Sequence, residues 1–113
     1  MAIQNRVTQD RRKISRVPAR LACRFSLNGE NHDATLLDLS FNGAFLSSKF
    51  LPPNGSSICL NLQTPSMKKS LDLDATVLRG SSVNSDHGTL SRFAIRFHSS
   101  SLDLMKLVQQ LIS

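Results

Sequence analysis

Alternating apolar and polar residues fill positions 19–29, which read ARLACRFSLNG. The apolar side chains recur at every second position, so one face of an extended chain carries Leu21, Cys23, Phe25 and Leu27. The Asn28-Gly29 pair that ends the stretch is typical of a two-residue hairpin turn. This stretch therefore predicts a first β-strand that turns directly into an antiparallel partner.

Five further strands are expected downstream, because short alternating runs are separated there by turn signals. In the first of them the pattern places Thr35, Leu37 and Leu39 on one side. Residues 80–88 are polar and rich in turn formers, and we expect them to be a loop. The five strands are expected at about 33–40, 44–48, 58–62, 71–77 and 92–97.

The sequence period changes after the serines at 99–101. Apolar residues then recur at helical spacing, and one of the serines is a natural N-cap with Asp103 in the first turn. The expected apolar stripe of this helix consists of Leu102, Met105, Val108, Leu111 and Ile112.

Six short strands at regular spacing indicate an antiparallel barrel or sandwich. We expect a mainly all-β fold, a six-stranded antiparallel β-barrel whose open end or side is covered by the C-terminal α-helix. Residues 1–18 are polar and basic without convincing periodicity, and Pro18 favours an extended chain before it. We expect them to form a flexible basic arm in front of one domain at 19–113.

The formal net charge is +6, and its placement is uneven. Seven of the 14 lysines and arginines lie within the first 24 residues, where Asp10 is the one acidic residue. Such a concentration points to an anionic partner, namely nucleic acid, a nucleotide or a membrane surface, although a solubilising tail is the simpler explanation of a basic run.

Other features argue against several classes of protein. Two cysteines make no disulfide framework, and no apolar run has the length of a signal peptide core or a membrane span, so we expect a cytoplasmic protein with no membrane partner. The phenylalanines are expected mostly in the core, with Phe41 as the exception. We expect no metal site, because the three histidines are far apart and are predicted to be solvated: His32, His87 and His98. No nucleophile elbow, phosphate-binding loop or zinc-protease motif is present, so no catalytic activity is expected.

Two short motifs carry the functional signal. The segment 12–16, RKISR, places two arginines four residues apart just before the first strand, and the segment 38–43, DLSFNG, spans the end of the second strand and its turn. With the order of arm, six strands and helix, they resemble the PilZ family, whose signatures are an R-x-x-x-R arm and a D/N-x-S-x-x-G turn. The resemblance covers the chain from about Arg11 to the C-terminus.

The resemblance implies a bacterial receptor for cyclic di-GMP, held between the arm and the barrel surface, with no cofactor. An arginine fork pairs bidentately with phosphate oxygens or with the O6/N7 edge of guanine, and a carboxylate accepts the N–H groups of the opposite guanine edge. An extra arginine before the first motif favours an intercalated pair of ligands over one. By family pattern, the ligand-binding residues are Arg11, Arg12, Arg16, Asp38, Ser40 and Gly43.

Three of these positions also suit a turn. Ser40 lies two residues after Asp38 and is expected on the same side of the strand. Both residue types stabilise turns, and Gly43 can adopt a positive φ or let a ligand approach the backbone. The turn role and the ligand role are compatible.

Two other functions stay open. A small β-barrel that binds nucleic acid would use the basic arm on phosphates and would not need Asp38. A ligand-free adaptor would bind only another protein. In either the receptor or the adaptor hypothesis the downstream protein is unknown, and the effect acts in trans or through self-association, for example as a ligand-induced dimer. Arg79 and Arg96 are within reach of a ligand, but solvated or paired arginines are the simpler interpretation.

Overall fold

The computed structural model describes residues 17–65, 67, 69–86, 88–99 and 101–112. Six strands precede one helix, and each strand is antiparallel to its neighbours. The elements are β1 (Val17–Leu27), β2 (Glu30–Leu39), β3 (Gly43–Ser48), β4 (Ser57–Leu62), β5 (Leu71–Ser85), β6 (Gly88–Phe97) and α2 (Leu102–Ile112).

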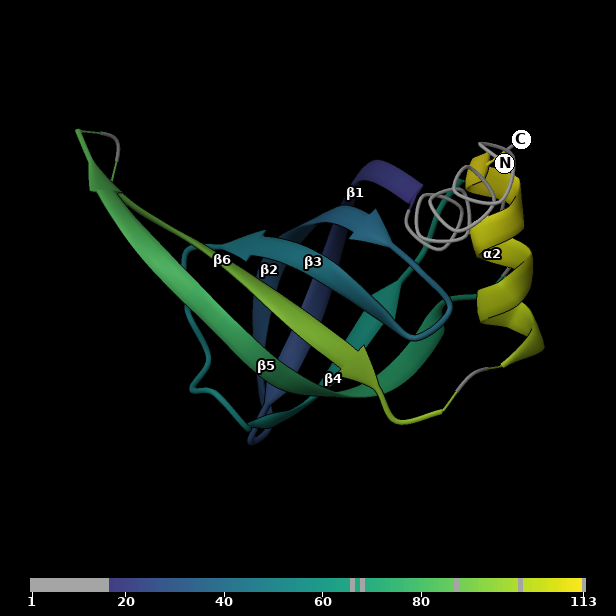
Figure 1. Ribbon diagram of the computed structural model, residues 1–113, viewed down its shortest axis with the longest axis horizontal. Coiled ribbons are helices and arrows are strands. Elements are labelled where there is room, and N and C mark those ends of the chain that lie inside the picture. The colour runs from purple at the N-terminus through teal and green to yellow at the C-terminus, as the bar shows by residue number, and fades with distance from the viewer. Residues whose placement is uncertain (1–16, 66, 68, 87, 100, 113) are drawn as a thin grey trace, which may run out of the picture.

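The strands close into a barrel in the order β1-β2-β3-β6-β5-β4 (Figure 1). Closure depends on a short pairing of β1 with β4, in which Phe25 lies opposite Leu60. The predicted six-stranded antiparallel barrel with a C-terminal helix is confirmed. The first strand begins at Val17, two residues before the alternating pattern starts.

Strand alternation places the core as the sequence predicts in four of the five strands for which a face was predicted, namely β1, β4, β5 and β6. The inward faces of β4, β5 and β6 are buried, and Phe25 in β1 is fully enclosed. The predicted face of β2 is wrong, because Leu36 is fully buried whereas Thr35 and Leu37 are half-buried. A bulge between Leu36 and Asp38 shifts the register by one residue, so Leu39 returns to the core with the opposite parity.

The loop predicted at 80–88 is also wrong. Both strands continue far beyond the barrel as a long β5–β6 hairpin that projects to one side (Figure 1). Its cross-strand pairs run down to Ser85 opposite Gly88. The small polar residues of this segment have the composition of a loop. They are held in strands by the pairing of β5 with β6 and by side-chain hydrogen bonds, for example the one between the hydroxyls of Ser82 and Ser91 at 2.7 Å.

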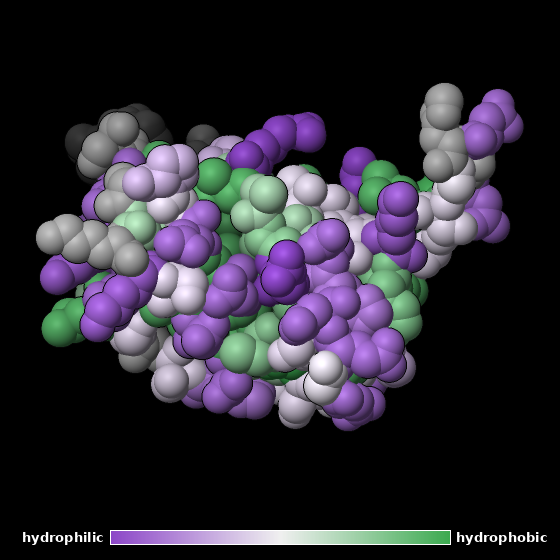
Figure 2. Space-filling view, turned by 180° about the vertical axis from the view of Figure 1, so that it is seen from behind, coloured by the Kyte–Doolittle hydropathy of each residue, from purple (hydrophilic) through white to green (hydrophobic). Residues whose placement is uncertain are grey.

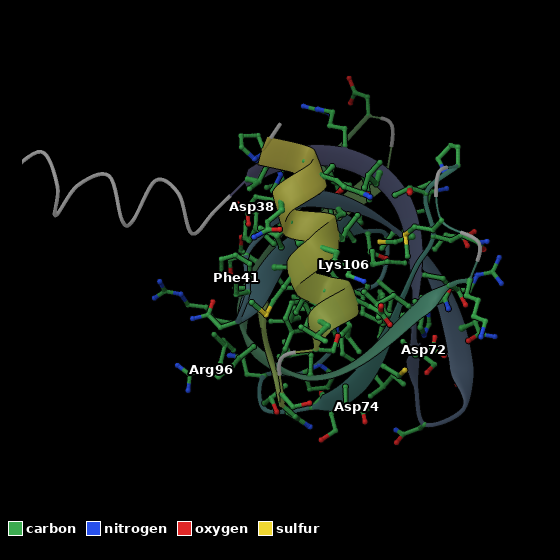
Figure 3. All side chains as sticks on the ribbon, turned by 90° about the vertical axis from the view of Figure 1, so that its right-hand side faces the viewer. Asp38, Phe41, Asp72, Asp74, Arg96 and Lys106 are labelled. Atoms are coloured by element: carbon green, nitrogen blue, oxygen red, sulfur yellow. The ribbon has the colours of Figure 1, made fainter. Side chains whose placement is uncertain are left out.

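The C-terminal helix lies across one end of the barrel (Figure 3). The Ser101 hydroxyl accepts a hydrogen bond from the Leu104 amide at 3.1 Å, which confirms the predicted serine N-cap. The predicted stripe is partly wrong, because Leu102 is 72% and Met105 is 40% exposed, and the Ile112 side chain lies outside the described ones. The helix buries instead a stripe rotated toward Leu104, Leu107 and Val108, with Leu111 half-buried at its edge.

Several residues outside the core have defined surroundings. Burial raises the pKa of the half-buried Cys23 thiol to about 11, so the thiol is protonated at neutral pH, as expected of a small buried hydrophobe.

The prediction that the histidines are solvated is wrong for His32, which lies in β2 and stacks on Phe50 with ring centroids 4.2 Å apart. His98 is exposed and His87 lies outside the described residues. None of the described helices is long and apolar enough to cross a bilayer.

Candidate functional site

A row of cross-strand partners runs over the outer face of the barrel. Asp38 on β2 lies opposite Phe45 on β3, Phe45 lies opposite Ala94 on β6, and Ala94 lies opposite Arg79 on β5. Neighbouring strands are about 4.8 Å apart, so the backbone positions of Asp38 and Arg79 are separated by about 14 Å along the sheet, across three strand spacings. The row therefore has an acidic end and a basic end, with Phe45 and Ala94 between them.

These residues line a hollow of about 500 Å³. Gly80, Ser81 and Arg92 complete its wall, and Arg92 lies opposite Ser81 in the next row. Volumes of about 300–1,000 Å³ are typical of small-molecule sites. The two arginines and the carboxylate give this hollow both donors for an anion and an acceptor for N–H groups.

The strand that begins the described chain enters beside this hollow. In the β1–β2 pairing Val17 lies opposite Leu39 and Pro18 lies opposite Asp38. Directly opposite residues of an antiparallel pair have Cα atoms about 4.5–5.5 Å apart. The first residues of β1 thus lie next to Asp38.

Ser40 is occupied by the turn between β2 and β3. Its side chain is 6% exposed, and its hydroxyl donates to Asn42 Oδ1 at 2.7 Å and accepts from the Gly43 amide at 3.1 Å. The Ser40 amide donates to the Gly43 carbonyl at 2.9 Å. The expected position of Ser40 on the same side as Asp38 depends on strand alternation. Because β2 ends at Leu39, the alternation does not extend to Ser40.

Gly43 is required by close packing rather than by its φ, which is not positive. It lies opposite Arg96 on β6, and a Cβ atom built on it would overlap the backbone carbonyl oxygen of Ile95. The glycine thus lets β3 and β6 approach while Ser40 holds the preceding turn. Within the second motif, Asp38 is the residue whose side chain faces the hollow.

Replacing Ser40 by alanine should lower the free energy of unfolding by about 1–3 kcal/mol, because the part-buried hydrogen bonds from the turn amides to its buried hydroxyl are lost. Urea denaturation measures this loss. The exposed Ser57 at the start of β4 offers a control, and Ser57→Ala should change stability by less than about 0.5 kcal/mol. Equal stability of the two variants would contradict this role of Ser40.

The remaining predicted residues are placed unevenly. Arg11, Arg12 and Arg16 lie outside the described residues. Arg96 is exposed on the outer face of β6, on the same side of the barrel as Asp38 and Phe41, whereas Asp72 and Asp74 lie on the other side (Figure 3). Sequence reasoning missed Phe45 and Arg92. The sequence pattern could predict on which face of its strand each of them lies. Their position beside Asp38 depends on the register between strands.

A family model for the PilZ domain matches residues 10–113. The chain belongs to the PilZ domain family. PilZ domains are typically binding modules without catalytic activity. The match covers the described barrel, the helix and the last residues of the basic arm, and so includes both motifs. A comparison with curated proteins finds no match.

Solved structures share the fold of this PilZ domain. The PilZ domain of YcgR from Escherichia coli, solved with c-di-GMP, is 20% identical with a TM-score of 0.65, and the match covers 86% of this chain and 85% of that one. MotI/DgrA, an inhibitor of motility from Bacillus subtilis, is 17% identical with a TM-score of 0.66, over 87% of this chain. PlzA from Borreliella burgdorferi, in complex with c-di-GMP, is 15% identical with a TM-score of 0.57, over 93% of this chain.

The PilZ chain spans about half the length of two of these proteins, 48% of MotI/DgrA and 48% of PlzA. At identities of 15–20% these likenesses show a common fold.

Proposed function

We propose that this PilZ domain is a receptor for cyclic di-GMP, which it binds in the outer-face hollow beside Asp38. The observation that carries the proposal is the pairing of Pro18 with Asp38. Arg16 directly precedes Val17 in the sequence, so the arginine motif ends where β1 begins. The pairing of β1 with β2 supports a site shared by the arginine motif and the carboxylate of the turn motif.

The chemistry of the hollow suits a guanine dinucleotide. The Asp38 carboxylate offers acceptors for guanine N–H groups, and the guanidinium groups of Arg79 and Arg92 offer forked donors for phosphate oxygens or guanine O6 and N7. The half-buried Phe45 ring in the row between them gives an apolar floor. Arg12 and Arg16 are proposed to close over the ligand from the arm, with Arg11 favouring a second stacked molecule.

Ser40 and Gly43 are proposed to act on the ligand through the shape of the turn. They hold the end of β2 against β3 and β6, and so hold Asp38 at the rim of the hollow. Micromolar affinity, about −8 kcal/mol, is a reasonable scale for the complex. Ordering the arm opposes binding by about 1–2 kcal/mol for each backbone residue fixed.

The proposed output is a change in contact with a downstream protein. The domain has no catalytic role in this scheme: an arm that folds across the barrel creates a new surface, which a partner or a second copy recognises. Cytoplasmic cyclic di-GMP would be the signal.

Replacing Asp38 by alanine should weaken cyclic di-GMP binding about 10–100-fold in isothermal titration calorimetry, because an acceptor for guanine N–H groups is lost from the site. Asp72→Ala is the matched control: it removes the same charge from an exposed position on the other side of the barrel and should leave the affinity unchanged. Absence of heat with the unaltered protein at micromolar concentration would reject the receptor function.

The same pair of variants separates the receptor from a nucleic-acid-binding barrel. A protein that tracks phosphates binds a single-stranded oligonucleotide with an affinity that falls steeply with salt. Removal of the Asp38 charge would then leave binding unchanged or strengthen it. Stronger oligonucleotide binding by Asp38→Ala, without a response to cyclic di-GMP, would favour that alternative.

A further inference from the structure

The projecting part of the β5–β6 hairpin has two unlike faces. On one face polar side chains bond across the strands, Ser82 to Ser91 and Thr89 to Asn84 at 2.8 Å. On the other face Val83 lies directly opposite Leu90, and these side chains are 66% and 45% exposed. Figure 2 shows hydrophobic surface where the hairpin leaves the barrel, bordered by hydrophilic residues. The polar face is satisfied internally, whereas the apolar pair faces solvent.

This apolar pair continues the surface of the candidate site. Val83 and Leu90 lie one step along the face from Ser81 and Arg92, and these four residues line a hollow of about 340 Å³. It shares Ser81 and Arg92 with the hollow at Asp38. Leu90 also borders a third hollow, of about 450 Å³, beside the stacked rings of His32 and Phe50. One continuous surface thus links the site to the hairpin.

The outer edge of β5 on this hairpin has no partner among the described strands. β4 pairs with β5 only as far as Thr76, and the last backbone bonds on that side join Val77 to residues 55 and 56. Beyond it β5 continues to Ser85 with β6 on one side. Every second residue of such a strand directs its N–H and C=O groups away from its partner, which is a template for another strand.

Beyond the register shift at Val77 and Arg79, the free edge carries none of the side chains that usually block strand addition. Residues 80–85 read GSSVNS and contain no lysine, proline or acidic residue, the types that commonly block edge pairing. The hollows along this face and its base are lined by three cations, Arg79, Arg92 and Lys49, and by two carboxylates, Asp38 and Asp33. Asp33, at the far end of the third hollow, already pairs with Arg24 at 3.5 Å.

We propose that the β5 edge at residues 78–85 is a docking site for an extended segment of a partner protein that alternates apolar and acidic side chains. The segment adds as a strand to β5, its apolar side chains contact Val83 and Leu90, and its carboxylates approach Arg79 and Arg92. A second copy of this chain, or its own basic N-terminal segment, brings like charge to the same arginines and is disfavoured.

The β5 edge would be the surface that binds the downstream partner of the proposed function. This role rests on that function only for the coupling to cyclic di-GMP. Because the docking surface and the Asp38 hollow share Arg92 and Ser81, a bound dinucleotide would alter the charge that the partner meets.

The test uses a fluorescein-labelled eight-residue peptide of alternating valine and glutamate, titrated with the full chain in fluorescence polarisation. We expect saturable binding and slower amide exchange at residues 80–85. The same peptide with lysine in place of glutamate should bind at least tenfold more weakly. Methylation of every second peptide nitrogen on the pairing edge should abolish binding, because it removes the ladder hydrogen bonds.

A matched pair of variants locates the surface. Val83→Asp should reduce peptide affinity at least tenfold, whereas Asn84→Asp, which adds the same charge on the opposite face, should change it less than twofold. Neither exposed substitution should affect the unfolding temperature. No binding of the glutamate peptide, or equal loss in the two variants, would overturn the proposal. So would a concentration-dependent dimer that Val83→Asp abolishes, since the occupant would then be a second copy.

Cyclic di-GMP calorimetry on Val83→Asp keeps the two proposals apart. Retained dinucleotide binding with lost peptide binding supports the docking site. If the unaltered protein binds the dinucleotide normally but fails to bind the glutamate peptide, the docking site alone is rejected.

Discussion

Replacement of Gly43 by alanine should lower the free energy of unfolding by about 3 kcal/mol, because the new methyl group would overlap the Ile95 carbonyl oxygen. The obstacle is backbone on the neighbouring strand β6, so it cannot rotate away as a side chain would. Relief requires β3 and β6 to separate where Gly43 lies opposite Arg96, and this separation also disturbs the turn that Ser40 holds. A domain of this size is stable by about 5–15 kcal/mol, so the loss is a large fraction of the total.

Thermal unfolding followed by circular dichroism measures this effect, and we expect a fall in Tm of roughly 10–15 °C. Gly29→Ala is the control. Gly29 has a φ of 86° and nothing within 4 Å of its added Cβ, so backbone strain alone should cost about 1 kcal/mol. An unchanged Tm in Gly43→Ala together with lost dinucleotide binding would instead give Gly43 a direct role at the ligand.

Replacement of both Arg12 and Arg16 by alanine should weaken cyclic di-GMP binding at least about 100-fold, which places it beyond detection at micromolar protein. Each charge-assisted hydrogen bond contributes about 1.5–3 kcal/mol, and two are lost together. Asp38, Arg79 and Arg92 remain in this variant, but the two arm arginines that are proposed to close over the ligand are gone. Isothermal titration calorimetry gives the affinity directly.

The same segment supplies a control of equal charge. Arg6→Ala with Lys13→Ala removes two positive charges from the first 16 residues but leaves both motif arginines in place. We expect its affinity to fall less than about threefold, since only long-range attraction is reduced. An equal loss in the two double variants would mean that general charge, and not the spacing of Arg12 and Arg16, attracts the ligand.

Much of the fold could be predicted from the periodicity of the sequence. Alternation identified the buried faces of β1, β4, β5 and β6, because one side of each strand must face the single core. It failed at the β2 bulge, where an extra residue changes the parity between Leu36 and Leu39. It failed again in the hairpin, since GSSVNS has the composition of a loop and is held as a strand by its pairing with β6.

The helix illustrates a similar limit. The sequence predicted the helix and its serine N-cap correctly, but two overlapping apolar stripes are compatible with the same 11 residues. The barrel end selected the one through Leu104, Leu107 and Val108 and left Leu102 exposed. Which stripe is buried depends on the angle at which the helix meets the barrel, and local sequence does not encode that angle.

By itself the sequence determined which face of most strands is apolar, where the turn residues lie, and the two motifs. These features depend only on neighbours along the chain. Only the tertiary structure decided that Pro18 lies beside Asp38 and that Phe45, Ala94 and Arg79 extend the same row. Those neighbours come from four other strands. Their meeting depends on register across hydrogen-bonded pairs, which a bulge of one residue can shift.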